Sequence, residues 1–353
     1  MMKVASQLEV GEAIMKTPDL NFCIDHRNWT EALSEAFALL TCAGPGEVVC
    51  ITGPSRAGKS RLIYKLIDLL FGKDYDKDPF IMPCVVVEAV NSGPNGSFAT
   101  KSFTQRMLKA VKHPVLSIDD DNDDYFAYQK LERTTEATLR SALEQAFIAR
   151  QTKYLFIDEA QHARYAGKAT LAAHAVLDSW KCLAQTSGLV LVIVGAYPIL
   201  DILRNSPHML GRKHQVHLPR YQLTVDDVKH FSKIVAVYEN YLTVSDDLKG
   251  KLVPVSELLY EGSLGCIGLL SAWLLRAEAR GMLANSGITL ELLKKTMLSD
   301  ADRVEIEREI LAGEDALYST VGRKLPVQKT TRKKSSAKPF QRKQKGLSPG
   351  NRS

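Results

Sequence analysis

The apolar positions of this chain fall into two alternating patterns. Short, continuous apolar segments rich in Val, Ile and Leu are typical of strands buried on both faces of a sheet. Between them lie longer segments whose apolar residues recur every three or four positions, which is typical of amphipathic helices. Strands are predicted at 47–52, 81–90, 154–157, 189–194 and 214–218, and helices at 29–40, 61–71, 97–111, 132–150 and 171–185.

This alternation predicts an α/β fold, a three-layer α/β/α sandwich around a parallel five-stranded core. After Thr224 the pattern becomes helical, at 225–241, 246–260, 265–280 and 289–298, and predicts a smaller helical domain. The last 30 residues are rich in Lys, Arg, Ser, Gln and Pro, which is typical of disorder. The predicted organisation is an N-terminal extension at 1–28, an α/β domain at 29–222, a helical domain at 223–315 and a disordered basic tail at 316–353.

Composition places the chain among ordinary globular proteins, with 45% hydrophobic and 24% charged residues in 353. No uncharged apolar stretch reaches the roughly 18 residues that a membrane span needs, and the N-terminus lacks the apolar run of a signal peptide. The six cysteines form no C-x-x-C pair, which favours reduced, buried thiols. We therefore expect a cytoplasmic protein with no membrane partner.

Charge is divided unevenly along the chain. The net charge is +6, but residues 323–353 hold eleven Lys or Arg and no Asp or Glu, so residues 1–322 carry 35 basic and 40 acidic residues. The basic character belongs to the tail, which indicates a polyanionic partner such as DNA. A solubilising or linker role for the tail is the alternative.

A glycine-rich motif, G-x-x-x-x-G-K-S, connects the strand predicted at 47–52 to the helix predicted at 61–71. Glycines allow the backbone to wrap around phosphates, and the amides of the following helix N-terminus point at the anion. In this pattern the lysine reaches the β and γ phosphates and the serine hydroxyl binds Mg²⁺. The predicted nucleotide-binding residues are Gly53, Pro54, Ser55, Arg56, Ala57, Gly58, Lys59, Ser60 and Arg61.

Two carboxylates, Asp158 and Glu159, follow the apolar strand predicted at 154–157. Ligands bind at this end of the strands in open α/β sheets. We expect Asp158 to bind Mg²⁺ together with Ser60, and Glu159 to act as the base that deprotonates an attacking water. The chain lacks the N-K-x-D motif that reads guanine, so ATP is preferred over GTP. The sequence therefore predicts an ATPase with Lys59 and Glu159 as catalytic residues and ATP and Mg²⁺ as cofactors.

This combination of motifs resembles the AAA+ ATPases. The resemblance implies a small helical lid after the nucleotide-binding domain, and a polar sensor residue after the fourth strand, where this chain has Ala196 followed by Tyr197. It also implies an arginine finger that reaches the nucleotide of a neighbouring subunit; Arg212 matches best and Arg204 second. The arginine that the family carries early in a lid helix is not evident in 262–268. These departures predict slow hydrolysis, stimulated by DNA or a partner.

Within that family, the segment Phe156-Ile157-Asp158-Glu159-Ala160-Gln161-His162 resembles the TniB/TnsC group of bacterial transposition regulators. The resemblance covers about residues 25–285. It implies a homo-oligomer, a ring or filament on double-stranded DNA, that recruits a transposase and works with a target-selection protein, with hydrolysis controlling disassembly. Candidate DNA contacts are Thr100, Lys101 and Gln105 on one predicted helix, and Lys333 and Lys334 in the tail. An ordinary solvated face is an equal interpretation of that helix.

Two further hypotheses use the same nucleotide residues. One is an AAA+ or STAND-like ATPase outside transposition, in phage defence or partner loading. The other is a nucleotide-gated scaffold with little turnover, which the departures at Ala196 and in 262–268 favour.

Overall fold

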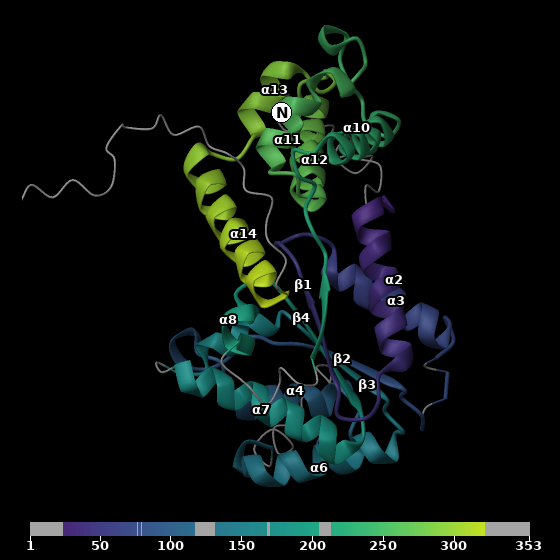
Figure 1. Ribbon diagram of the computed structural model, residues 1–353, viewed down its shortest axis with the longest axis vertical. Helices are drawn as coiled ribbons and strands as arrows, with labels where there is room; N and C mark the ends of the chain where they lie inside the picture. The colour runs from purple at the N-terminus through teal and green to yellow at the C-terminus, as the bar shows by residue number, and fades with distance from the viewer. Residues whose placement is uncertain are drawn as a thin grey trace, which may run out of the picture.

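The structure is a computed structural model that describes residues 24–75, 77–78, 80–116, 131–167, 170–204 and 213–321. Its centre is one five-stranded sheet in the order β2-β3-β4-β1-β5, with every pairing parallel (Figure 1). The parallel five-stranded core predicted from the sequence is confirmed. The strands are β1 (Val48–Thr52), β2 (Cys84–Glu88), β3 (Tyr154–Asp158), β4 (Val190–Gly195) and β5 (Lys213–His217).

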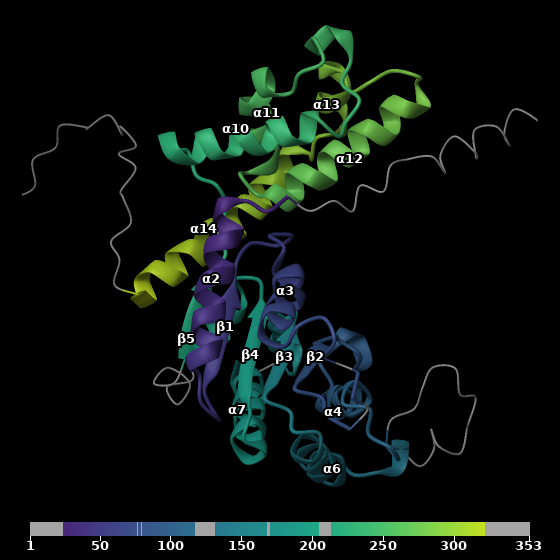
Figure 2. The same ribbon diagram turned by 90° about the vertical axis from the view of Figure 1, so that its right-hand side faces the viewer.

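Helices cover both faces of the sheet. Alternate residues of each strand point to opposite faces, so each apolar strand contributes to two hydrophobic cores. In β1, Val48 and Cys50 face one hydrophobic core, whereas Val49 and Ile51 face the other. The predicted three-layer sandwich is therefore confirmed (Figure 2). The first core is completed by α4 (Thr100–Ala110), α6 (Glu136–Ala149), α7 (Thr170–Ser187) and α8 (Ile199–Arg204), and the second by α2 (Arg27–Cys42) and α3 (Lys59–Phe71).

A separate helical domain with its own core lies at one end of the molecule (Figures 1 and 2). The helix predicted at 246–260 is interrupted: two 3₁₀ turns, Asp246–Leu248 and Val253–Val255, precede a shorter helix. Pro254 lies in the second turn, where its missing N–H and fixed φ favour a helix start over a helix interior. The helices of this domain are α10 (Val225–Glu239), α11 (Ser256–Ser263), α12 (Ile267–Leu283) and α13 (Leu290–Thr296).

The last helix, α14 (Asp300–Val321), is absent from the sequence-based prediction. It leaves the helical domain and returns to the α/β domain, where it packs beside α8 (Figure 1). Ile310 and Leu317 are buried in the same core as β4. The boundary predicted at 315/316 therefore falls inside a helix, because Ala316 and Leu317 bury apolar surface there. Residues 322–353 of the predicted tail lie outside the described residues.

Within the part of the chain that the structure describes, no single helix is both long and apolar enough to cross a membrane. One bent pair, 253–263 with 267–283, meets the criteria of length and composition only when its two helices are combined. Helix α12, the longer member, has Leu270, Trp273 and Leu274 in the core of the helical domain.

Candidate nucleotide-binding site

The site lies where the carboxyl ends of three neighbouring strands meet. Strand β1 runs into the glycine-rich loop, β3 ends at Asp158, and β4 ends at Gly195. The sheet register pairs Thr52 with Gly195 and Ile157 with Ile193, so the ends of β1, β3 and β4 are adjacent. Segments more than 130 residues apart in the chain thus converge at the edge where open α/β sheets bind ligands.

The loop between β1 and α3 folds tightly around the Lys59 side chain. Gly58, which caps α3, has a φ of 91°, in the left-handed region where glycine is unstrained. Lys59 is only 6% exposed, and its Nζ donates to the carbonyl oxygens of Gly53 at 3.2 Å and Pro54 at 2.8 Å. Burial lowers the pKa of Lys59, and the nearby charges of Glu159 and Asp158 offset part of that shift. The ammonium group therefore lies near Glu159, the predicted base, and Asp158, the predicted magnesium ligand.

The two predicted magnesium ligands are in direct contact. The Ser60 hydroxyl at the start of α3 donates to Asp158 Oδ2 at 2.6 Å, and Asp158 Oδ1 accepts from the Glu159 amide at 2.8 Å. A serine hydroxyl and a carboxylate are oxygen ligands of the kind that Mg²⁺ prefers. Among the described residues there is no cluster of three or more His, Cys, Asp or Glu that could hold a metal. The pair fits a magnesium ion that takes its remaining ligands from water and nucleotide phosphates.

Glu159 occupies an unusual backbone position. Its φ of 52° is in the left-handed region, which non-glycine residues seldom adopt and which is often found at functional sites. It precedes a 3₁₀ helix, Ala160–Tyr165, which turns the chain sharply after β3. The Glu159 carboxylate accepts a hydrogen bond from Nε2 of Gln161, a residue to which the sequence analysis gave no role.

The end of β4 has no polar side chain directed at the site. Ala196 occupies the expected sensor position and is buried. The hydroxyl of Tyr197, the alternative sensor, is bonded to Nε2 of His217 on β5 at 2.9 Å. Burial lowers the pKa of His217 to about 4, so this imidazole is neutral near pH 7. Tyr197 therefore joins β4 to β5.

The first turn of α12 lies directly on the glycine-rich loop. A Cβ at Gly268 would lie 1.8 Å from the carbonyl oxygen of Arg56, and one at Gly265 would lie 2.0 Å from the carbonyl oxygen of Tyr221. Cys266 between them is buried, and burial raises the pKa of its thiol to about 12. No side chain fits at position 268, which lies in the segment 262–268 where the resemblance to the AAA+ ATPases led us to expect a lid arginine.

The first turn of α2 also reaches the site; its residues up to 28 belong to the predicted N-terminal extension and Trp29 begins the predicted α/β domain. Trp29 packs near Gly58, and the Arg61 guanidinium lies over the Trp29 ring, 4.8 Å from its centre. In the described structure the buried Trp29 Nε1 has no hydrogen-bond partner. Arg27 forms ion pairs with acidic residues at the start of α10. The sequence signal for this contact was a tryptophan in the first turn of a predicted helix. Sequence alone cannot tell such a tryptophan from an ordinary core residue.

The remaining predicted site residues are dispersed. Arg204 ends α8, where it donates to the carbonyl oxygen of Ala316 in α14. Lys101 donates to the carbonyl oxygen of Glu132, and Gln105 is half-buried on the same helix. Three predicted residues, Arg212, Lys333 and Lys334, lie outside the described residues.

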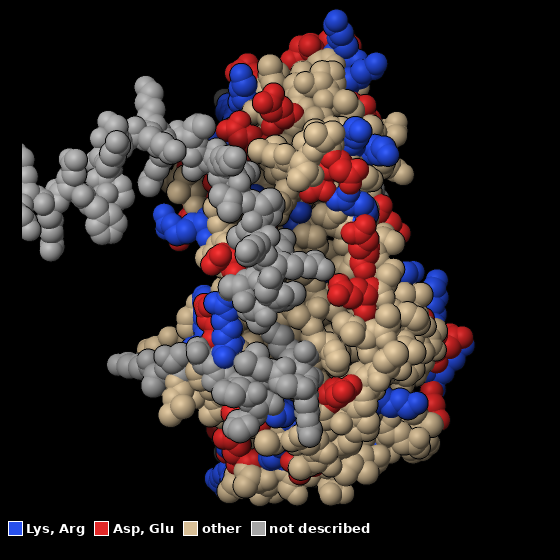
Figure 3. Space-filling view, viewed as in Figure 1, with Lys and Arg blue, Asp and Glu red and all other residues tan. Residues whose placement is uncertain are grey.

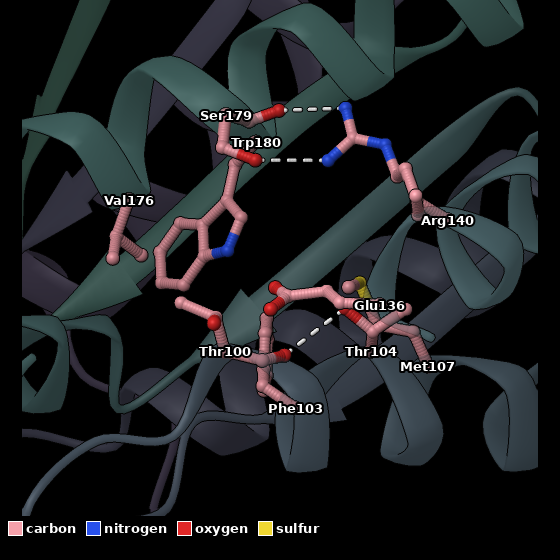
Figure 4. A pocket seen from close by; sticks show the side chains of 10 residues that line it. Thr100, Phe103, Thr104, Met107, Glu136, Arg140, Val176, Ser179 and Trp180 are labelled. Carbon is pink, nitrogen blue, oxygen red and sulfur yellow. Dashed lines mark hydrogen bonds between the residues drawn. The ribbon is translucent and has the colours of Figure 1, made fainter. Parts of the chain in front are cut away.

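Thr100 borders a cavity of about 220 Å³ between α4, α6 and α7 (Figure 4). Phe103 and Trp180 form part of its wall, and Arg140 at its edge is bonded to Ser179. The cavity is away from the glycine-rich loop and belongs to no part of the predicted nucleotide site.

Comparison with known proteins agrees with this geometry. Residues 44–203, less than half of the chain, match the family model described as an AAA domain. No curated protein matches the chain.

Two solved structures share the fold. One is the Aeropyrum pernix ORC2 protein in ADPNP–ADP complexes, with 14% identity, coverage of 80% of this chain and 71% of that chain, and a TM-score of 0.51. The other is Cdc6p from Pyrobaculum aerophilum, with 15% identity, coverage of 81% and 70%, and a TM-score of 0.50. The fold is therefore that of the P-loop AAA+ ATPases, whereas the resemblance to the TniB/TnsC group stays a prediction.

Proposed function

We propose that this protein binds ATP with Mg²⁺ on the loop at 53–60 and hydrolyses it. One observation carries the proposal: the Ser60 hydroxyl and the Asp158 carboxylate, which are 98 residues apart, meet at 2.6 Å, with Lys59 and Glu159 directly beside them in the chain. A metal ligand pair, a phosphate-binding lysine and a base are the parts that phosphoryl transfer to water requires.

Each residue has a distinct role in this mechanism. The loop amides and the N-terminus of α3 bind the phosphates, and Lys59 reaches them by leaving the carbonyl oxygens of Gly53 and Pro54. Ser60 and Asp158 would hold Mg²⁺, which when bound neutralises charge on the phosphate oxygens. Glu159 accepts the proton of the attacking water, and its left-handed backbone lies at the turn that follows β3.

Two substitutions test these roles. Lys59→Ala abolishes ATP binding, whereas Glu159→Gln retains binding and blocks hydrolysis, because the amide cannot take a proton. Fluorescent-nucleotide titration and steady-state phosphate release measure the two effects. Lys65→Ala is the matched control, because Lys65 is exposed on the same helix and should change neither. Hydrolysis by Glu159→Gln at the parental rate would show that Glu159 is not the base.

The finer proposal is an ATP-dependent oligomer, a ring or filament, that assembles on double-stranded DNA and recruits a transposase and a target-selection protein. Its support is the resemblance to the TniB/TnsC group and the eleven basic residues of 323–353, which include Lys333 and Lys334. Basic and acidic side chains are interspersed on the face of the folded body seen in Figure 3, whereas residues 323–353 contain basic residues and no acidic ones. Arg212, or Arg204 in its place, is the proposed arginine finger between subunits.

Electron microscopy with ATP and duplex DNA tests this assembly. DNA-bound oligomers should form, and the affinity should fall as salt rises because phosphate contacts release counterions. Replacing Lys333 and Lys334 by Gln should weaken binding to all sequences alike and reduce the salt dependence. Monomers without affinity for DNA under these conditions would rule the proposal out.

A nucleotide-gated scaffold with little turnover is the second candidate. It is favoured by the buried Ala196 at the sensor position and by the contact of Gly268 with the loop, which leaves no room for a lid arginine. Phosphate release measured with DNA present separates the two candidates, since a scaffold would bind ATP without DNA-stimulated turnover. A role outside transposition, in phage defence or partner loading, is distinguished by the absence of a transposase gene beside this one.

A further inference from the structure

The side-chain amide of Gln161 connects the ends of β3 and β4. Its Nε2 donates to Oε2 of Glu159, and its Oε1 accepts from the backbone N–H of Ala196 at 3.0 Å. Glu159 directly follows β3 and Ala196 directly follows β4, and Ala196 is 35 residues from Gln161 in the chain. Gln161 therefore contacts both the proposed base and the strand end where a sensor side chain is expected.

The chemistry of these partners fixes the orientation of the amide. A carboxylate only accepts hydrogen bonds and a backbone N–H only donates, so the NH₂ group must face Glu159 and the oxygen must face Ala196. A flipped amide would place its oxygen against the carboxylate and its NH₂ against the N–H. The two contacts thus hold one orientation of Gln161, and through it one orientation of the Glu159 carboxylate.

The adjoining glycine provides the space for this arrangement. A Cβ at Gly195 would lie 2.5 Å from Gln161 Oε1, which is closer than real Cβ atoms approach. The φ of Gly195 is not in the left-handed region, so backbone conformation does not require glycine here. A Cβ here would instead displace the end of the Gln161 side chain from its present position.

We propose that Gln161 is a positioning residue for hydrolysis, which holds the Glu159 carboxylate in place against the end of β4 and supplies the polar side chain that Ala196 lacks. The inference rests on the proposed ATPase function. One carboxylate oxygen is held by the Gln161 amide, and the second can accept the proton of the attacking water. Gln161 takes no part in proton transfer itself, so its removal should affect the rate of hydrolysis more than the binding of nucleotide.

Gln161→Met tests the proposal because methionine has a similar length and cannot form either hydrogen bond. We expect kcat to fall about 10- to 100-fold, the effect of a misplaced catalytic group, while the Kd of a fluorescent ATP analogue changes by less than about threefold. Gly195→Ala leaves Gln161 in the sequence but displaces its side chain, and should lower kcat in the same way. Thermal unfolding identifies any variant that loses its fold.

Gln161→Glu separates the two hydrogen bonds. A carboxylate at position 161 can still accept from the Ala196 N–H but cannot donate to the Glu159 carboxylate, so kcat should fall as in Gln161→Met while nucleotide affinity is retained.

The possible results separate this inference from the proposed function. Parental kcat in Gln161→Met, or a loss of kcat that accompanies equal losses of nucleotide affinity and thermal stability, overturns the positioning role. Parental kcat in Gln161→Glu does the same. If Glu159→Gln hydrolyses at the parental rate, the assignment of the base fails first; if Glu159→Gln is inactive and Gln161→Met is not, only the present inference fails.

Discussion

The buried ion pair between Arg220 and Glu314 joins the segment after β5 to α14, and its loss should destabilise the protein measurably. Arg220 Nε donates to Glu314 Oε1 at 2.9 Å, and Nη2 donates to Oε2 at 3.2 Å. The side chains are 11% and 7% exposed. Burial lowers the pKa of Arg220, but the hydrogen bond and the negative charge of Glu314 outweigh it, so the pKa is raised. The guanidinium therefore stays charged in a site that water barely reaches.

Glu314→Ala leaves that charge buried, with the carbonyl oxygen of Leu264 as a remaining acceptor at 3.3 Å. Breaking a buried pair by removing one partner typically costs about 3–5 kcal/mol. A Coulomb estimate agrees, since unit charges about 4 Å apart at an effective dielectric constant of 20 attract by about 4 kcal/mol. We expect a loss of this size in the free energy of unfolding.

Urea denaturation followed by tryptophan fluorescence measures this loss. The reporters Trp29, Trp180 and Trp273 lie in the three different hydrophobic cores. The matched control is Glu305→Ala, because Glu305 pairs with Arg308 on the same helix but both side chains are about 70% exposed, and such pairs contribute about 0–1 kcal/mol. Equal, small effects of the two substitutions would refute the burial of the Arg220 pair and the docking of α14.

Three further predictions concern other contacts. Gly268→Ala places a Cβ 1.8 Å from the Arg56 carbonyl oxygen and should cost about 1–3 kcal/mol in thermal unfolding, whereas Gly44→Ala, in open space, should cost little. His217, whose pKa burial lowers to about 4, is neutral when folded. As pH falls below about 6.5, this histidine is protonated in the unfolded chain before it is protonated in the folded protein. The free energy of unfolding therefore decreases between about pH 6.5 and about pH 4. His217→Gln should lessen this decrease in acid titrations monitored by circular dichroism. Arg27→Ala removes ion pairs to α10. The local free energy of opening at residues 24–28 should fall by about 2 kcal/mol, which faster hydrogen exchange there would report.

Much of the site was predictable because its chemistry is encoded locally. Gly58, Lys59 and Ser60 are consecutive residues between an apolar strand and an amphipathic helix, and Asp158 follows directly on another apolar strand. Parallel strands bring their carboxyl ends to one edge, so the meeting of Ser60 with Asp158 follows once the two strands share a sheet.

Other parts of the fold had no adequate local signal. Helix α14 has apolar positions that are sparse, and the basic tail that follows suggested that order ends near residue 315. Its position depends on Gly313 fitting against the Tyr197 ring and on the Arg220–Glu314 ion pair, which joins residues 94 positions apart. Periodicity within a segment carries no information about contacts at this separation.

The sequence by itself determined the class of fold, the loop that is proposed to bind phosphate and the carboxylates that face it, because strand, glycine turn and helix are specified by neighbouring residues. Only the tertiary structure decided that Gly268 rests on the glycine-rich loop, and that Gln161 joins Glu159 to Ala196. Both contacts arise from the packing of elements far apart in the chain, where side-chain volume and hydrogen-bond geometry determine which atoms meet.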